Sequence, residues 1–418
     1  MILENNDIVS TSGGIIYENT SGLSLVHNFT TFPVNTSYGN LKIISFTFTQ
    51  STTMTIYWGD GTNNTYSTRL SSGKYIIDIQ VGTGSDPLAS RTTAKTYGSS
   101  GTRVVKFLYE KELLQEIIMK NIALGIERSL IFSFSAHSNL KVFNLANVKK
   151  TTSSESLTDG TITQLNMLEL EDSIIEEFDA IQLFATSNPY HKKIPIEVFS
   201  LPLKVLQISG AHQTALATSN IDMIANFMQL ETLTLRIPFT QSQGFPVDLT
   251  NLIPTLKTLN FNVIQFTFAW TSLPLNIRTL SSLELLNLDL AIKASFSVSS
   301  TFFATMTSLK ELNINVLSRG ISDWSFIASL PTTFENLQCL GNNNTTRLNA
   351  SIMACFNWVK NNSLSSKIFA FESRSGYPAN IPSGTYAEPL DHASPASALE
   401  AIWVLRNDYG CTVTYRAV

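Results

Sequence analysis

The chain has 418 residues, of which 43% are hydrophobic and 14% are charged, and its formal net charge is -4. This length suffices for two or three ordinary domains, or for one elongated repeat array with a smaller module attached. Because the chain has no stripe of Lys and Arg and no block of like charge, nucleic acids and anionic membranes are poor candidate partners. The sequence contains no segment of ~18 apolar residues, so it predicts no membrane-spanning helix.

The N-terminal residues 1–22 are polar and rich in Gly, Ser, Thr and Asn, which predicts an extended arm. Acidic residues occur early in this arm, and no apolar run has the length of a signal peptide. If this is the full gene product, we expect that it does not enter the general secretory route by itself. A polar surface built from hydroxyl and amide side chains suits exported or virion proteins.

Residues 23–100 have the pattern of β-strands. Apolar and polar residues alternate over Ile43–Thr49, and a second run, Met54–Trp58, leads into the turn sequence Asp60-Gly61. A third strand is expected over Lys74–Val81. Asp-Gly between two strands predicts a hairpin turn, because Gly accepts a positive φ and Asp bonds its neighbouring backbone.

This region resembles PKD-type β-sandwich domains over about 60 residues. The resemblance lies in Trp58-Gly59-Asp60-Gly61-Thr62, then Tyr66, then Ser72-Gly73-Lys74-Tyr75-Ile76-Ile77-Asp78-Ile79. It implies that Trp58 belongs to the core and that the strand with Tyr75 closes the sandwich. No cluster of carboxylates surrounds Asp60 in the sequence, so no calcium site is expected there.

A motif of leucine, two residues, leucine, one residue, leucine then recurs, with other apolar residues at some positions. It begins at Leu114, Leu140, Leu165, Leu203, Leu230, Leu256, Leu283, Leu309 and Leu337. The steps are 25 to 28 residues, apart from one of 38 before Leu203. Periods of this length indicate a stacked solenoid of one strand and one return segment per turn. The long step predicts a protruding loop or an extra helical turn within residues 173–193.

The recurrence resembles leucine-rich repeat proteins over about 230 residues. Some return segments look extended, as over Ile194–Pro202, and others look helical, as over 221–228 and 324–330. The family places Asn three residues after the third apolar position of each motif. This chain instead has Ala211, Pro238, Ile264, Ala291 and Leu317 there, which predicts an irregular or wider corner.

After Ser363 the repeat register is expected to end. Phe369 and Phe371 suggest a last strand, the spacing of apolar residues over 397–408 predicts a helix that stops at Gly410, and 411–415 alternates as a strand. We expect this tail to cover the last exposed core face of the solenoid. The tail resembles the C-terminal ends of surface and virion proteins from Bacteroidetes and their phages, in the segments 383–386, 395–405 and 409–415.

The predicted fold is therefore mixed α/β by repeats. We expect an N-terminal arm over 1–22, a PKD-like β-sandwich over 23–100, a leucine-rich repeat solenoid with short strands and irregular or helical return arms over 101–364, and a C-terminal cap over 365–418.

The candidate binding face is formed by the outward positions of the repeat strands, which are polar. Its residues are Glu169, Gln207, Thr234, Arg236, Asn260, Asn262, Asn287, Asp289, Asn313 and Asn315. Amides and carboxylates offer donors and acceptors that suit sugar hydroxyls or a protein partner. Solubility alone also requires an exposed sheet face to be polar, and this explanation stays open.

Few residues suggest catalysis or metal binding. The five histidines lie far apart, and Cys339, Cys355 and Cys411 lack metal-ligand spacing. The cysteines are expected to be buried thiols, with a bridge between Cys339 and Cys355 left open. Glu169 and Glu171 could form the carboxylate pair of a glycosidase, although a solvated acidic stretch explains them more simply. No cofactor and no metal are expected.

The preferred function is that of a non-enzymatic phage virion structural protein, a spike, fibre or decoration component on the virion surface. The arm and the β-sandwich would contact other virion proteins, and the solenoid would present its face to a host glycan or protein. Such proteins are often trimers or rings. The alternative is a bacterial cell-surface adhesin with leucine-rich repeats, and a polysaccharide-degrading enzyme is a weaker candidate.

Overall fold

The chain is represented by a computed structural model. It describes residues 8–11, 14–17, 22–28, 42–58, 61–81, 93–95, 102–120, 123–124, 129–133, 138–144, 149–150, 165–168, 177–180, 201–209, 221–237, 249–263, 273, 275–290, 298–316, 321, 323–340, 344–372 and 381–415. The chain divides into two compact units. The N-terminal unit comprises Met1–Ala211 and Ala217–Asn220, and the C-terminal unit comprises His212–Leu216 and Ile221–Val418.

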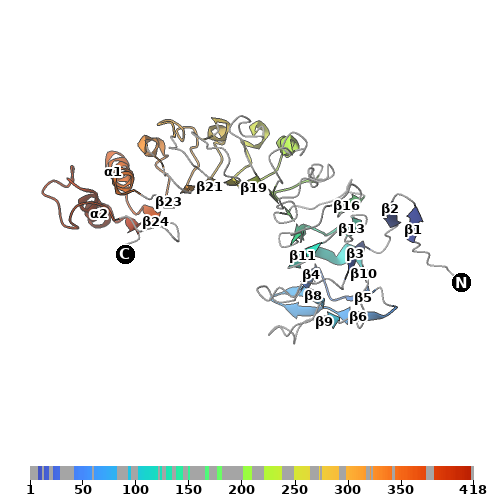
Figure 1. Ribbon diagram of the computed structural model, residues 1–418. Helices are drawn as coiled ribbons and strands as arrows, with labels where there is room; N and C mark the ends of the chain where they lie inside the picture. The colour runs from blue at the N-terminus through green and yellow to red at the C-terminus, as the bar shows by residue number, and fades with distance from the viewer. Residues whose placement is uncertain are drawn as a thin grey trace. The chain divides into compact units, whose positions relative to one another are not determined.

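The N-terminal unit contains strands of two sheets (Figure 1). The first sheet has the spatial order β16 (Leu165–Leu168), β13 (Ser129–Ser133), β3 (Gly22–Asn28), β10 (Thr102–Tyr109), β5 (Thr53–Tyr57) and β6 (Asn63–Ser67). The second has the order β18 (Val205–Ser209), β17 (Glu177–Ala180), β14 (Val142–Asn144), β11 (Leu114–Lys120), β4 (Lys42–Phe48), β8 (Lys74–Val81) and β7 (Arg69–Ser71), with β9 (Thr93–Lys95) beside β8.

Shorter elements complete this unit. Within the range expected as an extended arm, β1 (Ile8–Thr11) and β2 (Gly14–Tyr17) form an antiparallel pair. β12 (Ala123–Leu124) pairs with β15 (Lys149–Lys150), and the short 3₁₀ helix η1 (Lys111–Leu113) joins β10 to β11.

The two sheets of the N-terminal unit pack face to face, and aromatic rings from both sheets are in contact between them. The ring centroid of Phe46 on β4 lies 5.4 Å from that of Phe107 and 5.7 Å from that of Tyr109, both on β10. Ile44, Phe46 and Phe48 are all buried, as the alternating pattern over 43–49 predicts. Trp58 is also fully buried. Its indole Nε1 donates a hydrogen bond to Asn64 Oδ1 at 2.8 Å, because a buried indole N–H needs an acceptor.

The turns of this unit follow from the residues at their centres. Ser72 and Gly73 have φ values of 51° and 78°, and they link β7 to β8 as the two central residues of a tight hairpin. Gly61 has a φ of 85° in the turn between β5 and β6, whereas Asp60 lies outside the described residues. A positive φ at Gly61 agrees with the turn that Asp-Gly predicts.

The change from antiparallel to parallel pairing occurs at β11, which carries the first leucine motif. β11 pairs with β4 in antiparallel fashion on one side and with β14 in parallel fashion on the other. Strands from both sides of residue 100 therefore share these sheets.

The prediction that the motif at Leu165 forms a rung of the ladder is wrong. β16 belongs to the first sheet, where it lies parallel to β13, and β17 fills the ladder position between β14 and β18. The Cα register aligns Phe178 with Phe143 and Leu206. Leucine spacing does not encode which sheet a strand joins, and β17 carries one large apolar residue, so it has no recognisable motif. Part of the range 173–193, where a loop or helical turn is expected, is β17 itself.

The C-terminal unit is a solenoid of short parallel strands. Its ladder has the order β19 (Thr232–Ile237), β20 (Thr258–Val263), β21 (Leu285–Leu290), β22 (Glu311–Val316), β23 (Asn336–Leu340), β24 (Ile368–Glu372) and β25 (Thr412–Tyr415). The strands line one side of this unit and the return helices line the opposite side (Figure 1).

One continuous apolar column runs through the ladder, one residue per strand. It consists of Leu233, Leu259, Leu286, Leu312, Leu337, Phe369 and Val413, which share one register and are all buried. A second buried column two residues further on contains Leu235, Phe261, Leu288, Ile314, Cys339 and Phe371. Alternating residues point to opposite faces of a strand, so the residues between these columns point outward.

The return segments expected to be helical over 221–228 and 324–330 contain short 3₁₀ helices, and two further return segments do as well. The described ones are η4 (Ile221–Asn226), η6 (Thr250–Leu252), η7 (Leu275–Thr279) and η8 (Ser325–Ser329). A turn of about 26 residues leaves little chain after its strand and corners, and the tighter 3₁₀ helix suits short pieces. The corner positions at Ala211, Pro238, Ile264, Ala291 and Leu317 lie outside the described residues.

The expectation that the repeat register ends after Ser363 is wrong for the strands, because β24 and β25 continue the ladder. Their return segments are the α-helices α1 (Thr345–Asn361) and α2 (Ala398–Asn407). The side chain of Asn344 caps α1 and that of Ser397 caps α2, and Gly410 turns the chain into β25 with a φ of 63°. The longer return helices stretch the last two intervals, so the leucine period no longer reveals them.

All three cysteines are buried and free, so Cys339 and Cys355 form no bridge. Burial raises the pKa of the Cys339 thiol to about 12 and raises the pKa of Cys355 as well. In the part of the chain that the structure describes, no helix is both long and apolar enough to cross a membrane.

Candidate binding face and charged row

The outward positions of strands β19 to β24 form the outer face of the C-terminal unit. At its centre lies a column of polar residues in register, here named the amide column. Its members are Thr234, Asn260, Asn287, Asn313 and Gln338, one from each of five neighbouring strands. All five are half-buried, because neighbouring rungs of a sheet lie about 4.8 Å apart and cover one another's sides.

A second polar column lies two residues further along the strands. The register aligns Arg236, Asn262, Asp289 and Asn315. The side chains of Arg236 and Asn262 lie outside the described residues, whereas those of Asp289 and Asn315 are half-buried. β21 and β22 therefore each carry a pair of polar residues, Asn287 with Asp289 and Asn313 with Asn315, as the alternation of the sequence predicts.

The hydrogen bonds of the amide column are partly made within the protein. Asn260 Nδ2 donates to Thr234 Oγ1 at 3.0 Å, which joins β20 to β19. The Oδ1 atoms of Asn313 and Asn315 are covered and accept no hydrogen bond. An amide oxygen without a donor is unfavourable when it is removed from water. Both covered oxygens therefore lower the stability of the face and do not offer an acceptor to a ligand.

The outer face also has apolar members on its first column. Leu285 and Ile368 share this column with Thr232, Thr258, Glu311 and Asn336. The side chain of Ile368 is 44% exposed. The face thus combines amides with isolated apolar contacts, and Glu311 and Asp289 are its acidic groups among the described side chains.

Two of the predicted face residues do not lie on the described strands of the C-terminal unit. Gln207 lies on β18 in the N-terminal unit, where it is half-buried and in register with Asp179 of β17. Glu169 and Glu171 lie outside the described residues.

A row of alternating charges, not recognised in the sequence, runs beside the outer face. The residue immediately before each strand from β19 to β24 is charged, and the row reads Glu231, Lys257, Glu284, Lys310, Glu335 and Lys367. The backbone aligns these residues. Each N–H of Lys257, Glu284, Lys310 and Glu335 donates at 2.8 Å to the carbonyl of the preceding row member.

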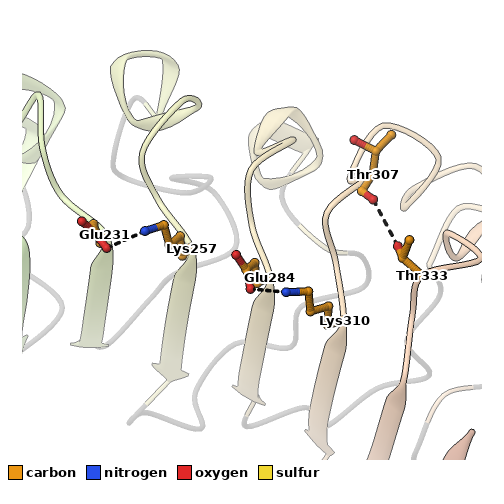
Figure 2. Close-up of polar contacts among 6 residues, drawn as sticks. All are labelled: Glu231, Lys257, Glu284, Thr307, Lys310 and Thr333. Carbon is orange, nitrogen blue, oxygen red and sulfur yellow. Dashed lines mark hydrogen bonds and ion pairs between the residues drawn. The ribbon is translucent and has the colours of Figure 1, made fainter.

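Two pairs in this charged row form direct ion pairs (Figure 2). Lys257 Nζ lies 2.7 Å from Glu231 Oε2, and Lys310 Nζ lies 2.7 Å from Glu284 Oε2. The hydrogen bond from Lys310, then its charge, lowers the pKa of Glu284, and the charge of Lys257 adds to this lowering. The pKa of Lys310 is raised by its hydrogen bond to Glu284, and the charge of Glu335 contributes. Glu284 and Lys310 therefore each sense both of their neighbours in the row.

The row could have been found from the sequence, because its members follow the first leucine of the motif in four of the six turns. Lys257, for example, follows Leu256, and Glu284 follows Leu283. The residues before β14, β17 and β18 are Lys141, Glu176 and Lys204, so the same alternation is present in the N-terminal part of the sequence. With 14% charged residues overall, nine successive charges at one repeat position do not follow from composition.

Side chains on the return side also join successive turns. Asn251 Nδ2 donates to the carbonyl of Ala225 at 2.9 Å, and Thr333 Oγ1 donates to the carbonyl of Thr307 at 3.3 Å (Figure 2). These bonds satisfy backbone carbonyls that leave the regular ladder.

One histidine has two acidic neighbours near the C-terminus. His392 Nδ1 lies 2.6 Å from Asp408 Oδ2, and His392 Nε2 lies 3.3 Å from Glu388 Oε1. The hydrogen bond with Asp408 is the main cause of the raised pKa of His392. The ring also packs edge-on against Trp403 of α2. Among the described residues, no group of three or more His, Cys, Asp or Glu side chains could hold a metal ion.

Comparison of the chain with protein-family models, with curated proteins and with solved structures found no match.

Proposed function

We propose that this protein is a non-enzymatic structural component of a phage virion, a spike, fibre or decoration protein, whose C-terminal unit presents the outer face to a host glycan or protein. The observation that carries this proposal is the amide column: four amide side chains and one threonine stand in register on neighbouring strands and remain half-exposed.

The chemistry of the face favours a neutral partner rich in hydroxyl groups. Each amide supplies both donors and an acceptor, as each sugar hydroxyl does, so the two can pair in either sense. The neighbouring charged row neutralises itself, and therefore a polyanion or a polycation gains little long-range attraction here.

The finer assignment of the two units belongs to the same proposal. We assign residues 23–100 to a PKD-like β-sandwich on the Trp58–Thr62 sequence, and residues 101–364 to a solenoid of the leucine-rich repeat type on their recurring motif. The arm and the sandwich would contact other virion proteins, and the assembled form would be a trimer or a ring.

Binding by the outer face is tested with the double variant Asn287→Ala/Asn313→Ala. The probe is a panel of neutral bacterial surface polysaccharides, and binding is measured by calorimetry. Two lost hydrogen bonds of about 1 kcal/mol each reduce affinity roughly thirtyfold. Asn251→Ala on the return side is the matched control, because it removes one amide far along the turn from this face.

Equal affinity of the double variant and the wild-type protein would refute this binding site. Location is tested separately by immuno-electron microscopy of purified phage particles. Label on the particles supports a virion protein, whereas label confined to bacterial cells supports the adhesin alternative. Release of reducing sugar from the polysaccharides by the wild-type protein would replace the binding role with an enzymatic one.

A further inference from the structure

The charged row of the C-terminal unit has a period of two turns, although its strands have a period of one. Acidic residues stand before β19, β21 and β23, and basic residues stand before β20, β22 and β24. The buried columns do not make this distinction, because both kinds of turn supply the same apolar positions, as Leu259 and Leu286 do. The charges therefore distinguish each turn from its neighbours, which the apolar core positions do not.

The backbone places neighbouring charges of the row close enough to interact. The backbone bonds between row members fix successive side chains at the spacing of the sheet, about 4.8 Å. At that distance two opposite charges attract and two like charges repel, and in a partly solvated row the two cases differ in sign rather than in degree. The row side chains are 42% to 53% exposed in the two direct pairs, so each pair by itself adds little stability.

A repeat protein needs features that distinguish one turn from the next, because its turns resemble one another. Similar strands can slip by one turn, skip a turn, or pair with a turn of another copy during folding. With an alternating row, every one-turn slip places acid beside acid and base beside base. The correct stack is the arrangement in which all neighbouring charges are opposite.

We propose that the alternating charged row is a register device, which specifies the neighbour of each turn and makes two turns the building unit of the solenoid. This role is independent of any ligand of the outer face.

The test compares variants with identical composition and different charge order. The segregated variant, Lys257→Glu/Glu335→Lys, changes the row to three acidic residues followed by three basic residues. The inverted variant exchanges Glu and Lys at all six positions and so keeps the alternation within the C-terminal unit. Both retain the net charge of the wild-type chain. Lys367→Met alone serves as a control for the hydrogen bond that Lys367 Nζ donates to the carbonyl of Thr332 at 3.1 Å, because it removes this bond without placing two like charges side by side.

Urea unfolding of the full chain is measured at low salt and at about 1 M salt, where the screening length falls to about 3 Å. We expect the segregated variant to lose stability at low salt, to form aggregates visible by light scattering on refolding, and to recover at high salt. The inverted variant should behave as the Lys367→Met control does. An equal loss in both variants, no loss in the segregated variant, or a loss that persists at high salt would overturn the proposal.

Discussion

The two units hold their strands together by different means. In the N-terminal unit, strands distant in sequence face one another across a sandwich, and rings from β4 and β10 meet at its centre. In the C-terminal unit, each strand pairs with the strands of the turns before and after it, and one apolar column repeats. A sandwich concentrates its stability at a few large contacts, whereas a solenoid sums many similar ones between nearest neighbours.

The largest expected effects come from truncating one buried core side chain in each unit. Phe46→Ala removes a buried ring in contact with Phe107 and Tyr109, and we expect a loss of about 3–5 kcal/mol in the free energy of unfolding of the N-terminal unit. Leu286→Ala in the C-terminal unit should cost about 2–5 kcal/mol there. Hydrogen exchange read by mass spectrometry reports each unit separately.

In this experiment the unit that carries the substitution should lose protection and the other should keep it. A loss of protection across the whole chain from either substitution would show that the units unfold together and would remove the basis of the comparison.

The second prediction compares a mostly buried carboxylate of the N-terminal unit with a more exposed carboxylate of the C-terminal unit. Asp78 on β8 accepts hydrogen bonds from Ser45 of β4 and from Arg69 of β7, and its side chain is 14% exposed. Asp78→Ala should reduce the stability of the N-terminal unit by about 1.5–3 kcal/mol, because it removes charged hydrogen bonds across three strands. Urea unfolding measures this change. Glu284→Ala, in the exposed row of the C-terminal unit, is the control and should have a smaller effect.

The sequence predicted the repeating strands of the C-terminal unit well. Leu233, Leu259, Leu286 and Leu312 belong to one buried column, as the leucine motif requires. Burial of one face of a strand imposes a pattern of its own, which a periodic motif reveals. β24 and β25 were missed as continuing rungs because Phe369 and Val413 replace leucine and the helices before them lengthen the interval.

The sequence predicted less where pairing depends on distant strands. Nothing in Leu165–Leu168 distinguishes a strand beside β13 from a strand of the ladder, since both environments bury leucine. Over β20 to β22, Asn260, Asn287 and Asn313 share one register position, and their role in a binding face stays a prediction. The charged row was missed because outward charges on exposed positions are usually attributed to solubility, and its alternation becomes visible after the rungs are aligned.

The third prediction uses two tryptophans of the C-terminal unit that differ in one hydrogen bond. Trp358 on α1 donates from Nε1 to the carbonyl of Leu330 at 3.1 Å, whereas the Nε1 of Trp324 is buried and has no hydrogen-bond partner. Trp358→Phe should destabilise this unit by about 1–2 kcal/mol, since it leaves a buried carbonyl without a donor.

Trp324→Phe is the matched control for this change. It removes an unpartnered N–H together with some packing against Phe326, and we expect a smaller loss or a gain. Urea unfolding followed by circular dichroism measures both variants. If Trp324→Phe destabilised the protein more than Trp358→Phe, packing rather than hydrogen bonding would dominate at these positions.

The smallest expected effect is a pH response confined to the end of the C-terminal unit. His392 faces Asp408 and Glu388, with Asp391 beside it in the chain, while Lys360 Nζ donates to the carbonyl of Ala393 at 2.8 Å. Because the hydrogen bond to Asp408 raises the pKa of His392, the protonated ring is favoured in the folded protein. The stabilisation of the fold by the protonated ring is complete below the unfolded pKa of about 6.5 and is lost as the pH rises through the higher folded pKa.

Hydrogen exchange over residues 381–397, corrected for the intrinsic rate, should therefore be faster at pH 8.5 than at pH 6. His392→Gln should abolish this difference without affecting exchange in β19 to β22, and a pH response that survives in the variant would assign it to another group.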